Sequence, residues 1–476
     1  MLSIDRDSPE PFYQQVYRQI AQGIESGLYV EGNKLPSIRA CAQELGVSIT
    51  TIDQAYQRLT GEGYVEPHRG SGFVVCTPTI APQNLQGRFS DEYLRERDCL
   101  KHASRLRSDP SSVKFDFAYD SVDADTFPFN TWSSICREVF FSAGASHACL
   151  YNDRQGLRDL REQIVKYIAS DFGVHCSADQ VLVMPTTGDI VTELIRLFNP
   201  EDTIIAMENP GYDEVSRRLS AAGYMIRELP VHPYPSWDTV EEILDGVRLV
   251  FSTPTSQFPT NRPMPLEYRK ALVDWAKRTG SYIIDDEYGW ELSTAVSRVP
   301  SLGALDDSGH VITLGTFSNS FTPAICLSYG ILPPRLMLSW LEKHAEGHPQ
   351  VPWQTQAAMA AFMREGHWPV HVRRIRTASR KKRQVILRAI EECFGDTVEV
   401  VESPNSLYVL LQTKEIRCEA HLVEAAADTG VRIYPTSQYW RGNPPDDWRY
   451  VLVGYAGIGI DAIAPGIEEL ARAWAR

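Results

Sequence analysis

Short apolar runs alternate with amphipathic stretches through most of this chain. Between about residues 114 and 370, the stretches that separate the runs place apolar side chains at helical spacing, as in 266–276. This alternation predicts strands of a mostly parallel sheet, connected by helices that cover both of its faces. The predicted strands are Val181–Met184, Ile204–Met207, Leu249–Ser252, Ile283–Asp285, Val311–Leu314 and Ile325–Leu332.

The pattern changes on both sides of this region. After about residue 370 a long helix precedes three further strands, Leu407–Leu411, Val431–Tyr434 and Tyr450–Val453, which predicts a smaller α+β domain. Residues 79–113 are polar and lack a regular apolar period, so we expect a linker with a short helix at 92–106. The expected domains are therefore 1–78, 114–370 and 371–476, with 79–113 between the first two.

The first domain begins with a helical pattern and a recognisable turn. Phe12, Val16, Ile20 and Ile24 share one helical face before Gly27. Ser37 can cap a helix that ends near Leu45, Gly46 permits a tight turn, and Ser48 can cap a second helix over 49–59. Two short helices joined in this way predict a helix-turn-helix, whose second helix fits the major groove of DNA.

A hairpin follows over 64–75, with Arg69, Gly70, Ser71 and Gly72 at its tip. A glycine-rich wing brings backbone N–H groups close to phosphates while its arginine enters a groove. The alternative is a helical bundle that contacts proteins. The predicted DNA-contacting residues are Ser37, Arg39, Ser48, Thr50, Thr51, Arg69, Gly70 and Ser71.

The amino-acid composition limits the class of protein and the cellular compartment that we expect. The 476 residues are 43% hydrophobic and 23% charged, and no apolar run reaches the ~18 residues that cross a bilayer. Nine cysteines without a CxxC pair indicate reduced thiols in a cytoplasmic protein, with no metal site and no membrane partner expected. The net charge of −14 argues against general polyanion binding, although a small domain can still bind DNA locally.

Residues 10–75 resemble the DNA-binding domain of the GntR family of bacterial regulators. The resemblance depends on the following residues: Leu35-Pro36-Ser37, Arg39, Leu45-Gly46-Val47-Ser48, Thr51, Ala55-Tyr56, Leu59, Gly63 and Gly70-Ser71-Gly72. Ile49 departs from the family, which has an arginine after the capping serine; isoleucine can contact a thymine methyl but not guanine. Residues 1–78 hold six Lys or Arg against nine Asp or Glu, so we expect affinity to depend on dimerisation.

Residues 114–476 resemble fold-type I aminotransferases, and the combination with a GntR domain resembles the MocR subfamily of transcription regulators. The resemblance depends on Tyr151, Gly156-Leu157-Arg158, Glu208-Asn209-Pro210-Gly211-Tyr212, Thr253-Pro254, Gln257, Pro259-Thr260, Asp286-Glu287-Tyr288 and Gly315-Thr316-Phe317-Ser318. It implies a winged helix-turn-helix (α+β) followed by an α/β aminotransferase-like domain with a smaller C-terminal α+β domain.

The resemblance also implies pyridoxal 5'-phosphate as the family cofactor. Asp286 matches the carboxylate that pairs with the pyridine nitrogen, Tyr212 the stacking aromatic, and Tyr288 a tyrosine near the ring oxygen. Arg449 matches the arginine that takes a substrate carboxylate. A purely structural role is the alternative for two of these residues. Asp286 would then be a buried carboxylate whose hydrogen bonds come from the protein itself, and Tyr212 would serve only in packing.

Departures from the family concentrate where the cofactor is held. Asn319 replaces the covalently bonded lysine, and Cys326 replaces the arginine that binds the phosphate. Asp189 opens a helix at a further phosphate site, where two unit charges about 4 Å apart cost roughly 4 kcal/mol. Thr316 and Ser318 remain as hydroxyl donors. We therefore expect no covalent cofactor, and weak or no non-covalent binding.

The sequence thus predicts a cytoplasmic regulator that binds a double-stranded operator as a domain-swapped homodimer, with no catalytic residue. Its large domain would sense an unknown small molecule, and the acidic residues Asp189, Asp286 and Glu287 favour one that bears an amine. Three alternatives remain: an aminotransferase with an added DNA-binding domain, a lysine-knockout variant of a cofactor-binding regulator, and a dimerisation module without a ligand.

Overall fold

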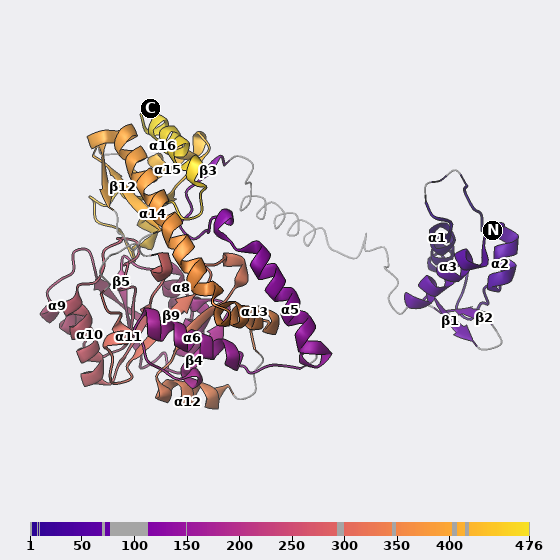
Figure 1. The fold of residues 1–476 in the computed structure, drawn as a ribbon, viewed down its shortest axis with the longest axis horizontal. Helices are drawn as coiled ribbons and strands as arrows, with labels where there is room; N and C mark the ends of the chain where they lie inside the picture. Colours follow the sequence, from indigo (N-terminus) through magenta and orange to yellow (C-terminus); the bar gives the residue numbers. More distant parts are fainter. Residues whose placement is uncertain are drawn as a thin grey trace. The chain divides into compact units, whose positions relative to one another are not determined.

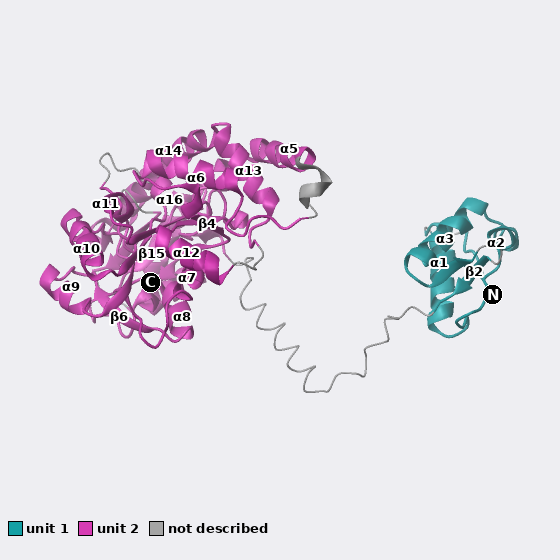
Figure 2. Cartoon of the chain, turned by 90° about the horizontal axis from the view of Figure 1, so that it is seen from below, with its two compact units in different colours: residues 1–109 teal, residues 110–476 magenta. Residues whose placement is uncertain are grey.

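The computed structural model describes residues 2–6, 8, 10–68, 72–76, 113–148, 150–292, 299–344, 349–401, 407–414 and 418–475. The chain forms two compact units, Met1–Asp109 and Pro110–Arg476, which Figure 2 shows in different colours. The predicted linker at 79–113, with its helix at 92–106, lies almost wholly outside the described residues.

The N-terminal unit is a three-helix domain with a strand pair. Its elements are α1 (Phe12–Glu25), α2 (Ile38–Leu45), α3 (Ile49–Gly61), β1 (Val65–His68) and β2 (Gly72–Val75). The strands pair antiparallel, from Val65 opposite Val75 to His68 opposite Gly72. The periodic apolar residues of α1, α3 and both strands close one core, which includes Val16, Ile20, Ile52, Ala55, Tyr56, Leu59, Val65 and Val75.

The larger unit is built around a seven-stranded sheet (Figure 1). Its strand order is β4-β10-β9-β8-β7-β5-β6. The strands are β4 (Val181–Met184), β5 (Ile204–Asn209), β6 (Met225–Pro230), β7 (Val247–Ser252), β8 (Tyr282–Asp286), β9 (Val311–Thr316) and β10 (Ser328–Ile331). The pairs among β5 to β9 are parallel, whereas β10 runs antiparallel to both β4 and β9.

Helices cover both faces of this sheet, as the alternation of runs and stretches predicts. They are α5 (Phe129–Ala148), α6 (Arg158–Asp171), α7 (Thr187–Ile195), α8 (Asp213–Ala221), α9 (Trp237–Ile243), α10 (Leu266–Thr279), α11 (Leu302–Leu305), α12 (Pro334–Lys343) and α13 (Trp353–Arg364). Neighbouring strand residues enter different cores: Ile205 and Met207 pack with α7 and α8, whereas Ala206 packs with α10. Strands buried on both faces explain the continuous apolar runs.

A second, antiparallel sheet lies C-terminal to the first in the chain. Its order is β11-β12-β15-β14, and a parallel pair, β3-β13, accompanies it. The strands are β3 (Phe115–Asp116), β11 (Val398–Val401), β12 (Tyr408–Thr413), β13 (Val431–Arg432), β14 (Tyr434–Pro435) and β15 (Val451–Gly454). Two helices, α15 (Glu419–Asp428) and α16 (Ile460–Trp474), pack on it.

One long helix, α14 (His367–Phe394), joins the two sheets of this unit (Figure 1). Its first half places Trp368 and Val372 in the core of the large sheet, and its second half places Ile386 and Phe394 in the core of the small one. The boundary expected at residue 370 therefore falls inside a continuous helix. The single predicted strand 325–332 is also too long, because Cys326 has a left-handed backbone that separates a short turn from β10.

Candidate functional site

The helix-turn-helix residues of the N-terminal unit divide into structural and exposed groups. Ser37 accepts a hydrogen bond from the backbone N–H of Ala40 (3.2 Å) and so caps α2. Ser48 caps α3 in the same way through Thr51 (3.1 Å). Gly46 adopts the left-handed conformation (φ 62°) that the tight turn requires. The caps fix where α3 begins, which determines the residues that its first turn presents.

Arg39 and Thr50 are exposed, and the side chain of Ile49 is 55% exposed in the first turn of α3. Thr51 shares a hydrogen bond of 2.8 Å with the Ser48 hydroxyl. An exposed apolar residue at the start of a second helix fits contact with a thymine methyl. Arg69, Gly70 and Ser71, the predicted tip of the wing, lie outside the described residues.

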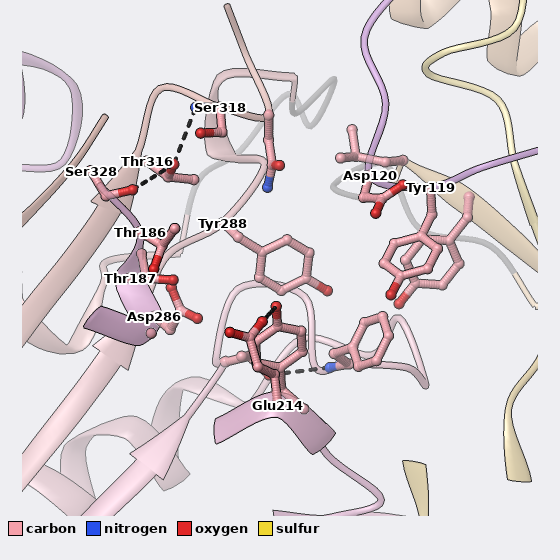
Figure 3. A pocket seen from close by; sticks show the side chains of 17 residues that line it. Tyr119, Asp120, Thr186, Thr187, Glu214, Asp286, Tyr288, Thr316, Ser318 and Ser328 are labelled. Atoms are coloured by element: carbon pink, nitrogen blue, oxygen red, sulfur yellow. Dashed lines mark hydrogen bonds between the residues drawn. The ribbon is translucent and has the colours of Figure 1, made fainter. Parts of the chain in front are cut away.

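A cavity of about 230 Å³ opens in the larger unit where the parallel strands end (Figure 3). Asp286 ends β8, Thr316 ends β9, and α7 begins beside them. Ligands of open α/β sheets bind at this carboxyl edge. The lining residues are Tyr119, Asp120, Thr186, Thr187, Gly188, Tyr212, Glu214, Thr253, Phe258, Asp286, Tyr288, Thr316, Ser318, Asn319, Ser328, Leu407 and Tyr408.

Asp286 lies at the buried side of the cavity. Its side chain is 7% exposed, and no described residue donates a hydrogen bond to its carboxylate. Burial, with the nearby Glu287 and Glu208 carboxylates, raises the pKa of Asp286 to about 7. Glu287 itself accepts a hydrogen bond from the Thr255 hydroxyl (2.8 Å) and does not line the cavity, so it is not among the acidic residues that could attract an amine there.

Aromatic rings form much of the remaining wall. The ring of Phe258 meets those of Tyr212 and Tyr288 edge to face, at centroid distances of 5.9 and 6.4 Å. Tyr288 donates its hydroxyl proton to the backbone oxygen of Ser256 (2.8 Å), and Tyr408 donates to that of Pro259 (3.1 Å). Because these hydroxyls bond to the protein, the rings present mainly apolar surface to the cavity.

Neutral hydrogen-bonding groups line another part of the cavity wall. Ser328 donates a hydrogen bond to the Thr316 hydroxyl (2.9 Å), and the backbone N–H of Ser318 donates to the same oxygen (3.1 Å). Thr186 caps α7 by accepting from the N–H of Asp189 (3.1 Å). The start of α7 therefore adds the weak positive potential of a helix N-terminus. Asn319 is half-buried beside these groups, and no described residue bonds its amide.

The expectation that Asp189 presents its charge to the cavity is wrong. Its carboxylate accepts a hydrogen bond from the Thr186 hydroxyl (2.7 Å) and pairs with Arg218 at 3.3 Å. Arg218 also pairs with Glu214 at 2.8 Å, so one guanidinium offsets part of the charge of both carboxylates. Asp189 is accordingly not among the lining residues. The sequence around the start of α7 gives no sign of this ion pair, because Arg218 lies 29 residues further along the chain.

Two further predicted site residues lie apart from the cavity. Cys326 is exposed, and its thiol contacts the backbone oxygen of Pro323. Arg449 donates to the backbone oxygen of Asp446 (3.2 Å) and does not line the cavity. The structure thus brings together Tyr212, Asp286, Tyr288, Thr316, Ser318 and Asn319, and it separates Asp189, Cys326 and Arg449 from them.

Sequence reasoning missed several lining residues that come from distant segments, namely Tyr119, Asp120, Glu214, Phe258 and Tyr408. Glu214 had a local signal, because it stands four residues before Arg218 on one helix and two after Tyr212, whose hydroxyl it accepts (2.9 Å). Asp120 had no such local signal, since only the fold brings residue 120 to the ends of β8 and β9. Figure 3 shows Asp120 and Asp286 on opposite sides of the Tyr288 ring.

The described part of the chain contains neither a candidate metal site nor a helix that could span a membrane. No cluster of three or more His, Cys, Asp or Glu side chains is placed to hold a metal ion. No helix among the described residues combines the length and the apolar character that crossing a membrane needs.

Comparison with known protein families agrees with both units. Residues 12–75 match "Bacterial regulatory proteins, gntR family", and residues 138–441 match "Aminotransferase class I and II". The larger unit also resembles the crystal structure of LysN, an alpha-aminoadipate aminotransferase from Thermus thermophilus, with a TM-score of 0.68. That alignment covers 79% of this chain and 96% of LysN at 21% identity, which establishes the fold alone.

Curated relatives match the whole chain. The HTH-type transcriptional regulator YhdI of Bacillus subtilis is 33% identical, over 99% of this chain and 97% of YhdI. The probable rhizopine catabolism regulatory protein MocR of Rhizobium meliloti is 30% identical, over 100% of this chain and 96% of MocR. Both units are therefore shared, in the same order, with proteins named as transcriptional regulators.

Proposed function

This chain belongs to the MocR-type transcriptional regulators of the gntR family, and from that premise we propose that its aminotransferase-like unit senses a small molecule without covalent cofactor chemistry. The N-terminal unit binds DNA, as the helix-turn-helix of the family implies. The larger unit holds the effector in the cavity at the ends of β8 and β9. Binding there alters how the protein, acting in the cytoplasm, engages its operator.

The absence of a cationic side chain from the described cavity lining is the main support for this function. Asn319 occupies the place of the lysine that the aminotransferase resemblance leads one to expect, and an amide cannot form the covalent bond to an aldehyde. The lining contains three carboxylates and no Lys, Arg or His among the described residues. Covalent catalysis of amino-group transfer has no amine to begin from.

The residues present fit pyridoxal phosphate only in part. Buried Asp286, to which no described residue donates a hydrogen bond, and the ring of Tyr212 suit a pyridine ring, which would gain its electron-sink character from such a carboxylate. Among the described lining residues, the aldehyde would find Asn319 instead of an amine, and the phosphate would find only hydroxyls and the start of α7. These residues do not fit a covalently held cofactor, so no step of the proposed function uses one.

We also propose that the protein acts as a homodimer with exchanged DNA-binding units. An exposed aromatic surface supports an interface on α5, where Phe129, Phe140 and Phe141 are 69%, 58% and 77% exposed. The N-terminal unit has more acidic than basic residues, so two half-sites would supply the affinity that one cannot.

The test measures binding of purified protein to DNA from upstream of its own gene, by fluorescence anisotropy against a scrambled fragment. Sequence-specific binding is expected, and Arg39→Ala should weaken it by about 1–3 kcal/mol if that arginine reads a base. Arg18→Ala, on α1, is the control and should bind like the unchanged protein. Equal affinity for both fragments would reject an operator in this DNA.

A further inference from the structure

The charged residues that line the cavity are acidic, which is unfavourable for an anionic ligand. Among the described residues that line it, Asp120, Glu214 and Asp286 are acidic and none is basic. Glu214 is largely compensated, because it accepts hydrogen bonds from Arg218 (2.8 Å) and Tyr212 (2.9 Å). Asp120 is exposed, and no described residue pairs with it. Among the described lining residues, the uncompensated charges are therefore those of buried Asp286 and exposed Asp120.

Asp286 is the decisive group, because a buried carboxylate normally has partners. Its side chain is 7% exposed and lines the cavity, yet no described residue donates to it. By contrast, the buried Glu208 nearby accepts hydrogen bonds from Ser252 and from both the hydroxyl and the backbone N–H of Thr253. A buried carboxylate without donors loses its hydration and gains nothing in return, unless a ligand supplies the missing donor.

Aromatic rings line the cavity around the position where a ligand's donor group would meet Asp286. Tyr212, Phe258, Tyr288 and Tyr408 line the same cavity as Asp286. Aromatic faces attract a cation and also cover an apolar body. The cavity volume of about 230 Å³ lies below the roughly 300–1,000 Å³ of sites for drug-sized ligands, which limits the ligand to a compact molecule.

We propose that this cavity binds a compact organic ammonium ion with an aromatic or apolar body and no carboxylate, with Asp286 as its counter-ion. The proposal rests on the effector-sensing function above and specifies its ligand class. The ammonium group donates to Asp286, the rings enclose the body, and the half-buried amide oxygen of Asn319 is a second acceptor on the wall.

The same observations disfavour an α-amino acid. A carboxylate on the ligand would need a cationic partner, and Arg449 instead bonds the backbone of Asp446 outside the lining. Arg218 lies near the start of α7 but is occupied by Asp189 and Glu214. A ligand carboxylate would therefore lie in a partly desolvated site that already holds Asp286, and like charges repel strongly there.

The experiment compares probes that differ by one charged group, by isothermal titration calorimetry on the full-length protein. The first set is tyramine, L-tyrosine and 3-(4-hydroxyphenyl)propanoate, and the second is phenethylamine, L-phenylalanine and 3-phenylpropanoate. In at least one set we expect the amine to bind at least about tenfold more tightly than its amino acid, with the carboxylate-only compound weakest. No binding by either amine, or tighter binding of the amino acids, overturns the proposal.

A variant tests the counter-ion. Asp286→Asn keeps the shape of the side chain and removes its charge, and it should weaken binding of the favoured amine by at least about tenfold. The matched control is Asp213→Asn, since Asp213 pairs with Arg217 at 3.0 Å and does not line the cavity. Unchanged amine affinity in Asp286→Asn overturns the proposal. The probe comparison needs no variant and stands if Asp286→Asn does not fold.

Operator binding, measured on the same samples without a probe, distinguishes a failure of the proposed ligand class from a failure of the proposed regulatory function. If operator DNA binds and amino acids bind more tightly than amines, the ligand class is wrong while a ligand-sensing regulator remains. If operator binding itself is absent, the regulatory function fails, whatever the calorimetry shows.

Discussion

Arg218 and Asp189 form an ion pair of 3.3 Å that offsets the charge of the Asp189 carboxylate, which does not line the cavity. The same guanidinium lies 2.8 Å from Glu214, which lines the cavity. One arginine of α8 therefore sets how much negative charge the start of α7 and the cavity wall present.

Arg218→Met should increase the affinity of the favoured ammonium probe a few-fold, because Glu214 regains its full charge beside the cavity. The cost in stability should be small, about 1 kcal/mol or less, since the Arg218 side chain is 33% exposed and such pairs are screened by water. Calorimetry and denaturant unfolding measure the two effects. Arg217→Met, which removes a pair with Asp213 on the same helix, should change neither. Weaker amine binding in Arg218→Met would contradict this account.

Asp286→Asn should stabilise the ligand-free protein above pH 7. The folded state raises the pKa of this carboxyl from 3.8 to about 7, so folding favours the protonated form. The group therefore costs stability as the pH rises from about 4 to 7, up to about 4 kcal/mol for three pKa units. Denaturant unfolding should show that gain at pH 8 and little difference near pH 4. Equal stability of the two proteins at pH 8 would show that the charge is compensated in the folded state.

The raised pKa of Asp286 also predicts how the affinity for an amine depends on pH. The ammonium ion prefers the ionised carboxylate, so amine affinity in the unchanged protein should rise between pH 6 and 8 and level off above that range. Calorimetry at a series of pH values measures this dependence. In Asp286→Asn the affinity, already weak, should be nearly flat over the range. A rise that persists in the variant would assign the titration to another group.

Ser48→Ala should destabilise the N-terminal unit by about 0.5–2 kcal/mol, because it removes the cap of α3. The Ser48 hydroxyl accepts the N–H of Thr51 at 3.1 Å. Thr50→Ala is the matched control: Thr50 is exposed in the same turn, has no capping bond, and should affect operator affinity without affecting unfolding. Hydrogen exchange at the start of α3 would report the difference. Equal protection in both variants would show that the cap is not what holds this turn.

Asn319→Lys alone should not restore tight, covalent binding of pyridoxal phosphate. The variant supplies the amine, but the described lining still lacks a cation for the phosphate. Because Cys326 lies outside the lining, adding Cys326→Arg to Asn319→Lys should not restore the attached cofactor either. The visible absorbance band of an attached cofactor, after gel filtration, tests both variants. A stable band in Asn319→Lys alone would show that the phosphate site is intact and that a single substitution silenced it.

Phe141→Glu should convert the proposed homodimer to a monomer at micromolar concentration. Phe141 is 77% exposed on α5, next to Phe140, which is 58% exposed, and a charge placed in an apolar interface is strongly unfavourable. Light scattering gives the mass directly. Leu338→Glu, at an apolar residue of α12 that is 61% exposed, is the control and should remain dimeric. A monomeric unchanged protein would reject the dimer, and a dimeric Phe141→Glu would move the interface away from α5.

Local patterns in the sequence determined much of the fold. The predicted strand Val181–Met184 matches β4, and the predicted caps Ser37 and Ser48 begin α2 and α3. Helix periodicity, capping and continuous apolar runs depend on residues within a few positions of one another, so they can be read without knowing the fold. The resemblance to MocR-type regulators, which the comparisons confirm, rests on motifs that are equally local.

Only the tertiary structure decided which of the predicted site residues share one cavity. It joined Asp286 and Asn319 with Asp120 and Tyr408, it paired Asp189 with Arg218, and it left Cys326 and Arg449 outside. Pairings across 29 residues, or between a strand end and a segment more than 100 residues distant, depend on the summed packing of every intervening element. The sequence by itself determined the family and the fold; the charge that the cavity presents was decided by long-range packing.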